Sequence, residues 1–157
     1  QLEAVLPATT IRPDLAAGAA DVLARLGPGR MQALCHHDAH AQNMVFDLSG
    51  RLWLVDWEYA GLGDPLFDLA SCASQLQLSA ERARYLCDEY IRAGGFVEWV
   101  RLDLARWAFD YLQWLWYRGL LASAAAGPDA IEAAPRAERI ERELQARASG
   151  VLRCNKH

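Results

Sequence analysis

The segment that most constrains the fold runs from residue 96 to residue 121, and it carries apolar side chains on nearly every face of the helix that it would form. A helix that is apolar all round has to be buried, because water would otherwise contact its hydrophobic side chains. Only several further elements packed around it can cover such a helix. With 157 residues, of which 53% are hydrophobic, the chain is long enough to build that core.

The remaining patterns predict more helices and a small β element. Helices are expected over residues 14–26, from Asp64-Pro65 onward, from Ser79 to Gly94-Gly95, and over residues 135–148. Short apolar runs typical of strands lie at residues 31–35, 44–46 and 51–55. A turn at residues 47–50 joins the second run to the third, as in a hairpin. The predicted fold class is α+β, mostly helical, with a small β element that carries polar loops.

Composition narrows the classes of function. The net charge is −4, which argues against a nucleic-acid-binding protein. No signal-peptide pattern and no membrane-spanning run is found in the sequence. The four cysteines stand singly, as reduced thiols do: Cys35, Cys72, Cys87 and Cys154. We therefore expect a cytoplasmic protein that binds neither nucleic acid nor a membrane.

Two acidic residues and an amide follow the strand candidates. Asp38 and Asn43 lie in the polar stretch of residues 36–43, and Asp56 follows the run at residues 51–55. Phosphoryl transfer needs one carboxylate that orients a substrate hydroxyl and accepts its proton. It also needs an amide oxygen and a second carboxylate that hold Mg²⁺ against the nucleotide phosphates. The alternative is ordinary turn chemistry, since Asp and Asn both favour turns.

Three motifs follow one another in this region: His36-x-Asp38-x-His40-x-x-Asn43, Asp56-Trp57-Glu58-Tyr59-Ala60-Gly61 and Gly63-Asp64-Pro65-x-x-Asp68-Leu69-Ala70. Through them, the chain resembles the aminoglycoside phosphotransferase and choline/ethanolamine kinase group over roughly residues 34–70. These enzymes are small-molecule kinases with a protein-kinase-like fold. The corresponding protein-kinase motifs are H-R-D-x-x-x-x-N and D-F-G.

The resemblance implies a role for each matching residue. Asp38 would be the catalytic base, and ATP would be the phosphoryl donor. Asn43 and Asp56 would be the Mg²⁺ ligands. His36 and Asp68 would support the catalytic loop, with Asp68 accepting backbone N–H bonds from it.

The resemblance also implies roles next to the catalytic residues. Glu58 would lie beside the metal site, and Tyr59 matches a position that lines the choline pocket of choline kinases. His40 is a candidate for a group that supports the catalytic residues, with an ordinary surface histidine as the alternative. Asp64 is expected to cap the helix that follows it.

The apolar segment also suggests a substrate class. Trp107, Tyr111 and Trp114 follow a three-to-four-residue spacing and share one helix face, with Asp110 beside it. An aromatic wall with a nearby carboxylate suits an ammonium group, at roughly 0.5–2 kcal/mol for each cation–π contact. The resemblance implies similar aromatic residues around choline, so we expect a choline-, ethanolamine- or thiamine-like alcohol, with an aminoglycoside as a further option.

Parts that such a kinase needs are not found in the sequence. The only lysine is Lys156, and no Gly-rich phosphate loop precedes the catalytic motif. We therefore expect residues 1–157 to be part of the C-terminal lobe of a kinase whose N-terminal, ATP-binding lobe is the missing covalent neighbour. We also expect the chain to be inactive alone.

Two alternatives remain open at this point. The chain would be a standalone helical binding module with a vestigial kinase loop if no such lobe belongs to it. The cluster His36-His37-Asp38-x-His40 is also similar to the His/Asp clusters of metallohydrolases, which bind Zn²⁺ or another transition metal.

Overall fold

The computed structural model describes residues 11–29, 32–123 and 128–151. The chain divides into two compact units. We call Leu26–Arg106 the site unit, and Gln1–Arg25 together with Trp107–His157 the helical unit. Residue 31, where the first strand-like run begins, and Cys154 and Lys156 lie outside the described residues.

The helical unit contains most of helix α2 (Pro13–Leu26), the later part of helix α5 (Trp99–Ser123) and helix α6 (Pro128–Val151). Helix α2 agrees closely with its prediction. The prediction for α6 was wrong at its start, because Pro135 lies inside the helix instead of beginning it. A buried stripe at helical spacing runs past this proline: Ala133, Ala137, Ile140 and Leu144. Burial of the stripe offsets the hydrogen bond that an interior proline removes.

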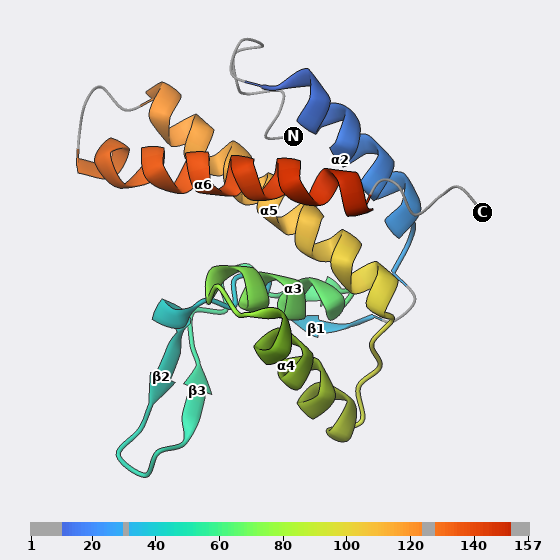
Figure 1. The fold of residues 1–157 in the computed structure, drawn as a ribbon. Coiled ribbons are helices and arrows are strands. Elements are labelled where there is room, and N and C mark those ends of the chain that lie inside the picture. The colour runs from blue at the N-terminus through green and yellow to red at the C-terminus, as the bar shows by residue number, and fades with distance from the viewer. Residues whose placement is uncertain (1–10, 30–31, 124–127, 152–157) are drawn as a thin grey trace. The chain divides into compact units, whose positions relative to one another are not determined.

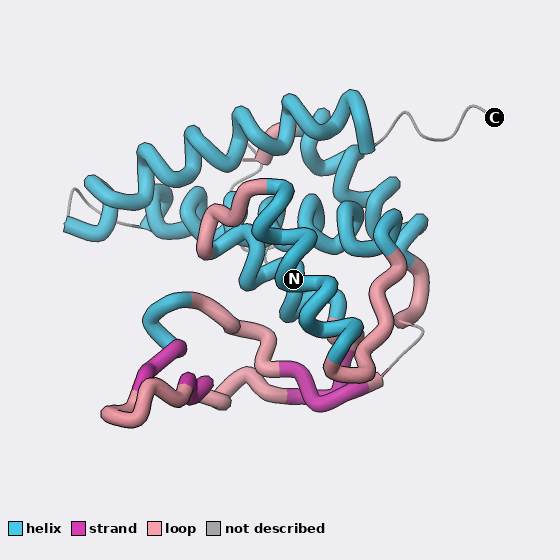
Figure 2. The backbone as a smooth tube through the Cα atoms, turned by 60° about the horizontal axis from the view of Figure 1, so that its bottom comes forward, coloured by secondary structure: helices cyan, strands magenta, loops and turns pink. Residues whose placement is uncertain are grey.

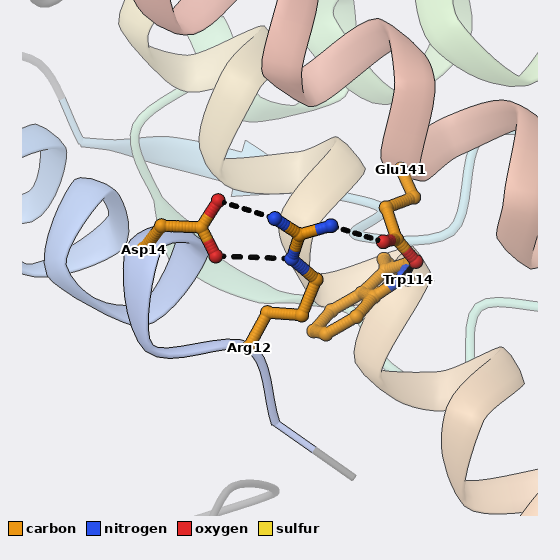
Figure 3. A network of polar contacts seen from close by, with 4 residues as sticks. All are labelled: Arg12, Asp14, Trp114 and Glu141. Carbon is orange, nitrogen blue, oxygen red and sulfur yellow. Dashed lines mark hydrogen bonds and ion pairs between the residues drawn. The ribbon is translucent and has the colours of Figure 1, made fainter.

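A polar network joins the three helices of the helical unit (Figure 3). The Arg12 guanidinium binds both carboxylate oxygens of Asp14, at 3.0 and 2.8 Å, and donates to Glu141 of α6 at 2.9 Å. The other carboxylate oxygen of Glu141 accepts the indole N–H of Trp114 in α5, at 3.2 Å. One arginine therefore connects the start of α2 with the facing sides of α5 and α6.

The site unit contains two small antiparallel sheets and two complete helices (Figures 1 and 2). Strand β2 (Met44–Phe46) pairs with β3 (Leu52–Leu54) in the predicted hairpin, which projects from the rest of the unit. Strand β1 (Ala33–Cys35) pairs with β4 (Gly61–Gly63), and helices α3 (Leu66–Gln75) and α4 (Ala80–Arg92) follow. The α+β prediction is confirmed.

Strand β4 is the element that sequence patterns did not indicate. Its sequence is Gly-Leu-Gly, which has neither the length nor the β-branched residues typical of a strand. At Gly63, an added Cβ would lie 2.7 Å from Cε1 of His37. The glycine is therefore needed because the histidine ring lies directly against the strand backbone.

The boundaries of the later helices follow local signals. The Ser79 hydroxyl accepts the N–H of Arg82 and caps α4, as predicted. Gly94, with φ of 95°, follows the end of that helix. Helix α5 begins at Trp99, three residues later than predicted. None of the helices in the described ranges combines the length and the apolar character needed to cross a bilayer.

The turn of the β2–β3 hairpin depends on one carboxylate. Asp47 accepts the backbone N–H groups of Ser49 and Arg51 at 2.9 and 3.0 Å, the Ser49 hydroxyl at 2.6 Å, and the indole N–H of Trp53 at 2.9 Å. The bonds from Ser49 and then Trp53 lower the pKa of Asp47 to about 2. The fold therefore favours the ionised carboxylate.

Asp47→Ala is expected to increase hydrogen exchange at the amides of Ser49 and Arg51, because both lose their acceptor. The stabilisation of the turn by ionised Asp47 is complete above the ordinary pKa of about 4 and is lost as the pH falls through about 2. Amide exchange measured by NMR checks the first statement. Ser49→Ala is the control, and it should raise the Asp47 carboxyl midpoint while the Arg51 amide stays protected. An Asp47 midpoint near 4 in the unaltered protein would contradict the assignment.

Candidate active site

The polar loop that follows β1 is held by a carboxylate from helix α3. Asp68 accepts the backbone N–H of His36 at 2.7 Å with one oxygen and that of His37 at 2.8 Å with the other. These are the bonds that the resemblance implied for Asp68. His37 has φ of 64°, in the left-handed region. The Asp68 carboxylate therefore accepts two hydrogen bonds at the part of the loop whose backbone adopts the unfavourable left-handed conformation.

His36 connects this loop with the strand that leads to Asp56. Its ring is buried, and Nδ1 accepts the N–H of Asp38 at 3.2 Å. The proton therefore sits on Nε2, which donates to the carbonyl of Val55 at 2.9 Å. The indole of Trp57 packs edge-on against the ring, with centroids 4.8 Å apart. A buried histidine thus connects the backbone at Asp38 with the backbone just before Asp56.

Asn43 holds Asp38 from the other end of the loop. Its amide nitrogen donates to the Asp38 carbonyl at 3.0 Å and to the Asp38 carboxylate at 3.2 Å. The backbone carbonyl of Asn43 accepts the backbone N–H of Val55 at 2.9 Å. Because both Asp38 contacts use the amide nitrogen, the amide oxygen of this buried residue remains available as a ligand.

Asp56 is exposed and lies two residues after the end of β3. Its φ is 64°, in the left-handed region, which non-glycine residues adopt rarely and Asp more readily than most. The Asp56 carboxylate and the Asn43 amide oxygen are the hard oxygen ligands that Mg²⁺ prefers. This donor set therefore fits the metal that the sequence analysis expected.

Glu58 and Tyr59 lie in the same acidic neighbourhood. The pKa of Tyr59 is raised above its usual value, first by the negative charge of Glu58 and a hydrogen bond to it, and also by the charges of Asp38 and Asp56. The Tyr59 ring is 62% exposed. An exposed aromatic ring among carboxylates is the arrangement that attracts a cationic ligand.

The histidine cluster does not form a transition-metal site. Both ring nitrogens of His36 have protein partners, and the His37 ring lies against Gly63. In the part of the chain that the structure describes, no three histidine, cysteine or acidic side chains converge as metal ligands. The described residues therefore speak against the metallohydrolase alternative, because the rings of His36 and His40 bind other groups of the loop and no third ligand joins them.

The aromatic residues expected at the substrate belong to the helical unit and are buried there. Trp107, Tyr111 and Trp114 stack in sequence, with centroids 5.7 and 5.8 Å apart. The indole N–H of Trp107 donates to the Leu144 carbonyl at 3.3 Å, and that of Trp114 donates to Glu141. Asp110 pairs with Arg147. The contacts of these four residues are those of packed helices, and their role at a substrate stays a prediction.

Sequence reasoning missed Arg101, the main partner of Asp64. One carboxylate oxygen of Asp64 accepts the N–H of Leu66, at the start of α3, at 3.0 Å. The other accepts from Arg101 of helix α5 at 2.6 Å, and Arg101 also donates to the carbonyl of Leu26. No local signal relates Asp64 to Arg101, because they are 37 positions apart.

Comparisons with known proteins found similar sequences and similar folds. The sequence model of a family described as "Phosphotransferase enzyme family" matches residues 2–105. Protein LicA of Haemophilus influenzae is 45% identical over 56 residues, which are 36% of this chain and 21% of that protein. Thiamine kinase of Escherichia coli is 43% identical over 63 residues, which are 40% of this chain and 21% of that protein.

A solved structure shares the fold. A choline/ethanolamine kinase family protein from Mesorhizobium loti matches with a TM-score of 0.66 and 28% identity, over 94% of this chain and 52% of that chain. The chain therefore spans about half the length of this relative. The segments matched in the two curated proteins span about a fifth of each.

Proposed function

Because this chain belongs to the phosphotransferase enzyme family, we propose that it forms part of a small-molecule kinase that transfers a phosphoryl group from ATP to an alcohol. The observation that carries the proposal is the arrangement around Asp38. Asp68 holds the loop, Asn43 holds the Asp38 carboxylate, and His36 connects both with the strand end that carries Asp56. Positioning and charge are the main sources of catalysis in phosphoryl transfer.

In this proposal, Asp38 is the catalytic base. It accepts the proton of the substrate hydroxyl as the alcohol oxygen attacks the γ-phosphorus of ATP. The new O–P bond forms while the bond between the γ-phosphorus and the bridging oxygen breaks, and the electron pair of that bond leaves with ADP. The proton stays on Asp38 until it passes to solvent.

Asn43 and Asp56 would hold Mg²⁺, through the free amide oxygen and the exposed carboxylate respectively. When bound, Mg²⁺ supplies positive charge that offsets the negative charge of the phosphate oxygens. The two ligands come from the ends of neighbouring strands, and the bond from Val55 N–H to the Asn43 carbonyl keeps those ends together. The chain thus preorganises the ligands before any nucleotide binds.

The substrate class that we favour is a small cationic alcohol, such as choline, ethanolamine or a thiamine-like alcohol. The negative charges of Glu58, Asp38 and Asp56 all act on Tyr59, whose ring is exposed. These groups suit an ammonium head group whose hydroxyl reaches Asp38. The names of the choline/ethanolamine kinase family structure and of thiamine kinase support the same class.

The test of this function is a substrate panel with the full-length protein that contains this chain. Choline, ethanolamine, thiamine and an aminoglycoside are offered with ATP and Mg²⁺, and ADP release is measured. Release that depends on one cationic alcohol and is lost in Asp38→Asn would support the proposal. If ADP release is fastest with the aminoglycoside, the kinase function is retained and the favoured substrate class is rejected. Asp38→Asn with undiminished activity would reject the function.

We further propose an N-terminal ATP-binding lobe as the covalent neighbour of the chain. The half-length match with the solved relative supports this. The hairpin also carries exposed apolar side chains on both faces, Val45 with Trp53 on one and Phe46 with Leu52 on the other. Exposed apolar side chains gathered on one element suit a segment that another part of a protein covers.

Residues 1–157 alone are accordingly expected to show no turnover. The only lysine in this sequence, Lys156, follows the catalytic motif, and no Gly-rich loop precedes that motif, so the parts that hold ATP in such kinases are not in this segment. ADP release by the isolated chain is compared with release by the full-length protein at equal concentration. Turnover by the isolated chain that disappears in Asp38→Asn would overturn this expectation. Inactivity of the full-length protein as well would instead favour the standalone binding module.

A further inference from the structure

His40 lies in the catalytic loop, and the reaction proposed above assigns no role to it. It lies at the N-terminal end of a short 3-10 helix (Ala41–Asn43), and its Nδ1 accepts the backbone N–H of Gln42 at 3.2 Å. Because Nδ1 is an acceptor there, the ring proton sits on Nε2. Nε2 lies 3.3 Å from one carboxylate oxygen of Asp38, Oδ2. The ring therefore lies between the backbone N–H of Gln42 and the carboxylate of Asp38.

The Asp38 carboxylate is bound asymmetrically. Its Oδ2 accepts the side-chain amide nitrogen of Asn43 at 3.2 Å, and Nε2 of His40 lies 3.3 Å from the same oxygen. Within the described ranges, neither donor contacts the other oxygen, Oδ1. With the Asn43 amide and the His40 ring nitrogen both beside Oδ2, rotation of the carboxylate about its terminal bond is restricted. Oδ1 is then the oxygen that remains free to accept a proton.

We propose that His40 is a positioning residue that, together with Asn43, holds Oδ2 of Asp38 and leaves Oδ1 for the substrate hydroxyl. This inference rests on the proposed phosphotransferase function and adds a specific role within it. Without His40, only the amide of Asn43 orients the carboxylate, and Oδ1 spends less time in the reactive direction. The effect acts on kcat and leaves ATP binding unchanged, since the bond between His40 and the proposed metal ligand Asn43 runs from the Asn43 N–H to the backbone carbonyl of His40 and does not need the ring.

Two substitutions separate the contact of the His40 ring with Gln42 from its contact with Asp38. In His40→Asn, the short side chain accepts the Gln42 N–H in place of Nδ1 and stops short of Asp38. In His40→Gln, the longer side chain places an amide N–H near the position of Nε2 and donates to Asp38, while the bond to Gln42 is lost. We expect His40→Asn to lower kcat about 10- to 100-fold with the KM for ATP unchanged, and His40→Gln to restore most of the loss.

The full-length protein serves for all measurements, with thermal midpoints recorded for each variant. His40→Asn is also made in the Asp38→Asn background, where it should have no further effect on kcat, because the carboxylate that it orients is gone. The inference fails, with the function intact, if His40→Asn keeps normal kcat, if His40→Gln is equally impaired, or if the loss persists in the Asp38→Asn background. If Asp38→Asn itself keeps full activity, the proposed function fails instead.

Discussion

Replacing Asp56 with alanine in the full-length protein is expected to abolish phosphotransfer. The substitution removes the only carboxylate among the two proposed Mg²⁺ ligands, and the Asn43 amide that remains carries no charge. The core does not need the Asp56 side chain, because this residue is exposed. Turnover is measured with saturating ATP and Mg²⁺, and thermal unfolding is followed in parallel.

Asp38→Asn and Asn43→Ala provide the comparison. Asp38→Asn keeps the shape of the side chain but removes the proton acceptor, so kcat should fall roughly 10²–10⁴-fold with little change in the KM for ATP. Asn43→Ala should lose less than Asp56→Ala, since water replaces an amide ligand in part. It also removes both bonds to Asp38, so part of its loss should appear in kcat. Asp56→Ala with near-normal turnover and an unchanged midpoint would contradict the metal-ligand assignment.

The largest effect on stability is expected at Arg101. The Arg101 and Asp64 side chains are only 9% and 10% exposed, and Arg101 also binds the carbonyl of Leu26. Arg101→Met leaves the Asp64 carboxylate buried without its cation, which costs about 3–5 kcal/mol of the free energy of unfolding. Urea denaturation of the protein and the variant, at the same pH and salt, measures this difference.

Two further variants test the physical reason. Asp64→Ser combined with Arg101→Met removes both charges and keeps an acceptor for the N–H of Leu66, so it should recover much of the lost stability. Arg139→Met is the matched control, because Arg139 pairs with Glu143 on the surface of α6 at 3.2 Å. Loss of that exposed pair should cost only about 0.3–0.5 kcal/mol. Equal losses for the two single arginine variants would show that burial of the Asp64–Arg101 pair is unimportant.

The catalytic loop shows how far sequence reasoning reaches. The spacing of Asp38, Asn43 and Asp56 between strand-like runs predicts that these groups meet. The structure shows Asn43 bonded to Asp38, and it bonds Val55, next to Asp56, to the Asn43 backbone and the His36 ring. The bonds expected from Asp68 are present. The contact of His40 with Asp38 was within reach as well, since both residues lie in one short loop.

Contacts between distant parts of the chain were not predictable in this way. The pairing of β1 with β4 depends on Gly63 lying against the His37 ring, and a strand of Gly-Leu-Gly has no pattern of its own. Spacing placed Trp107 and Trp114 on one helix face correctly. It did not reveal that α6 covers this face within the helical unit and bonds to both indole groups.

The sequence by itself determined the elements and the order of the chemical groups, because helical and strand periodicity, caps and short motifs are properties of neighbouring residues. Only the tertiary structure decided which distant groups became partners: Asp64 with Arg101, Asp110 with Arg147, and Glu141 with both Arg12 and Trp114. Such pairs form where packing removes two polar groups from water together. A buried charge or N–H group must find its partner among whatever the fold brings to it.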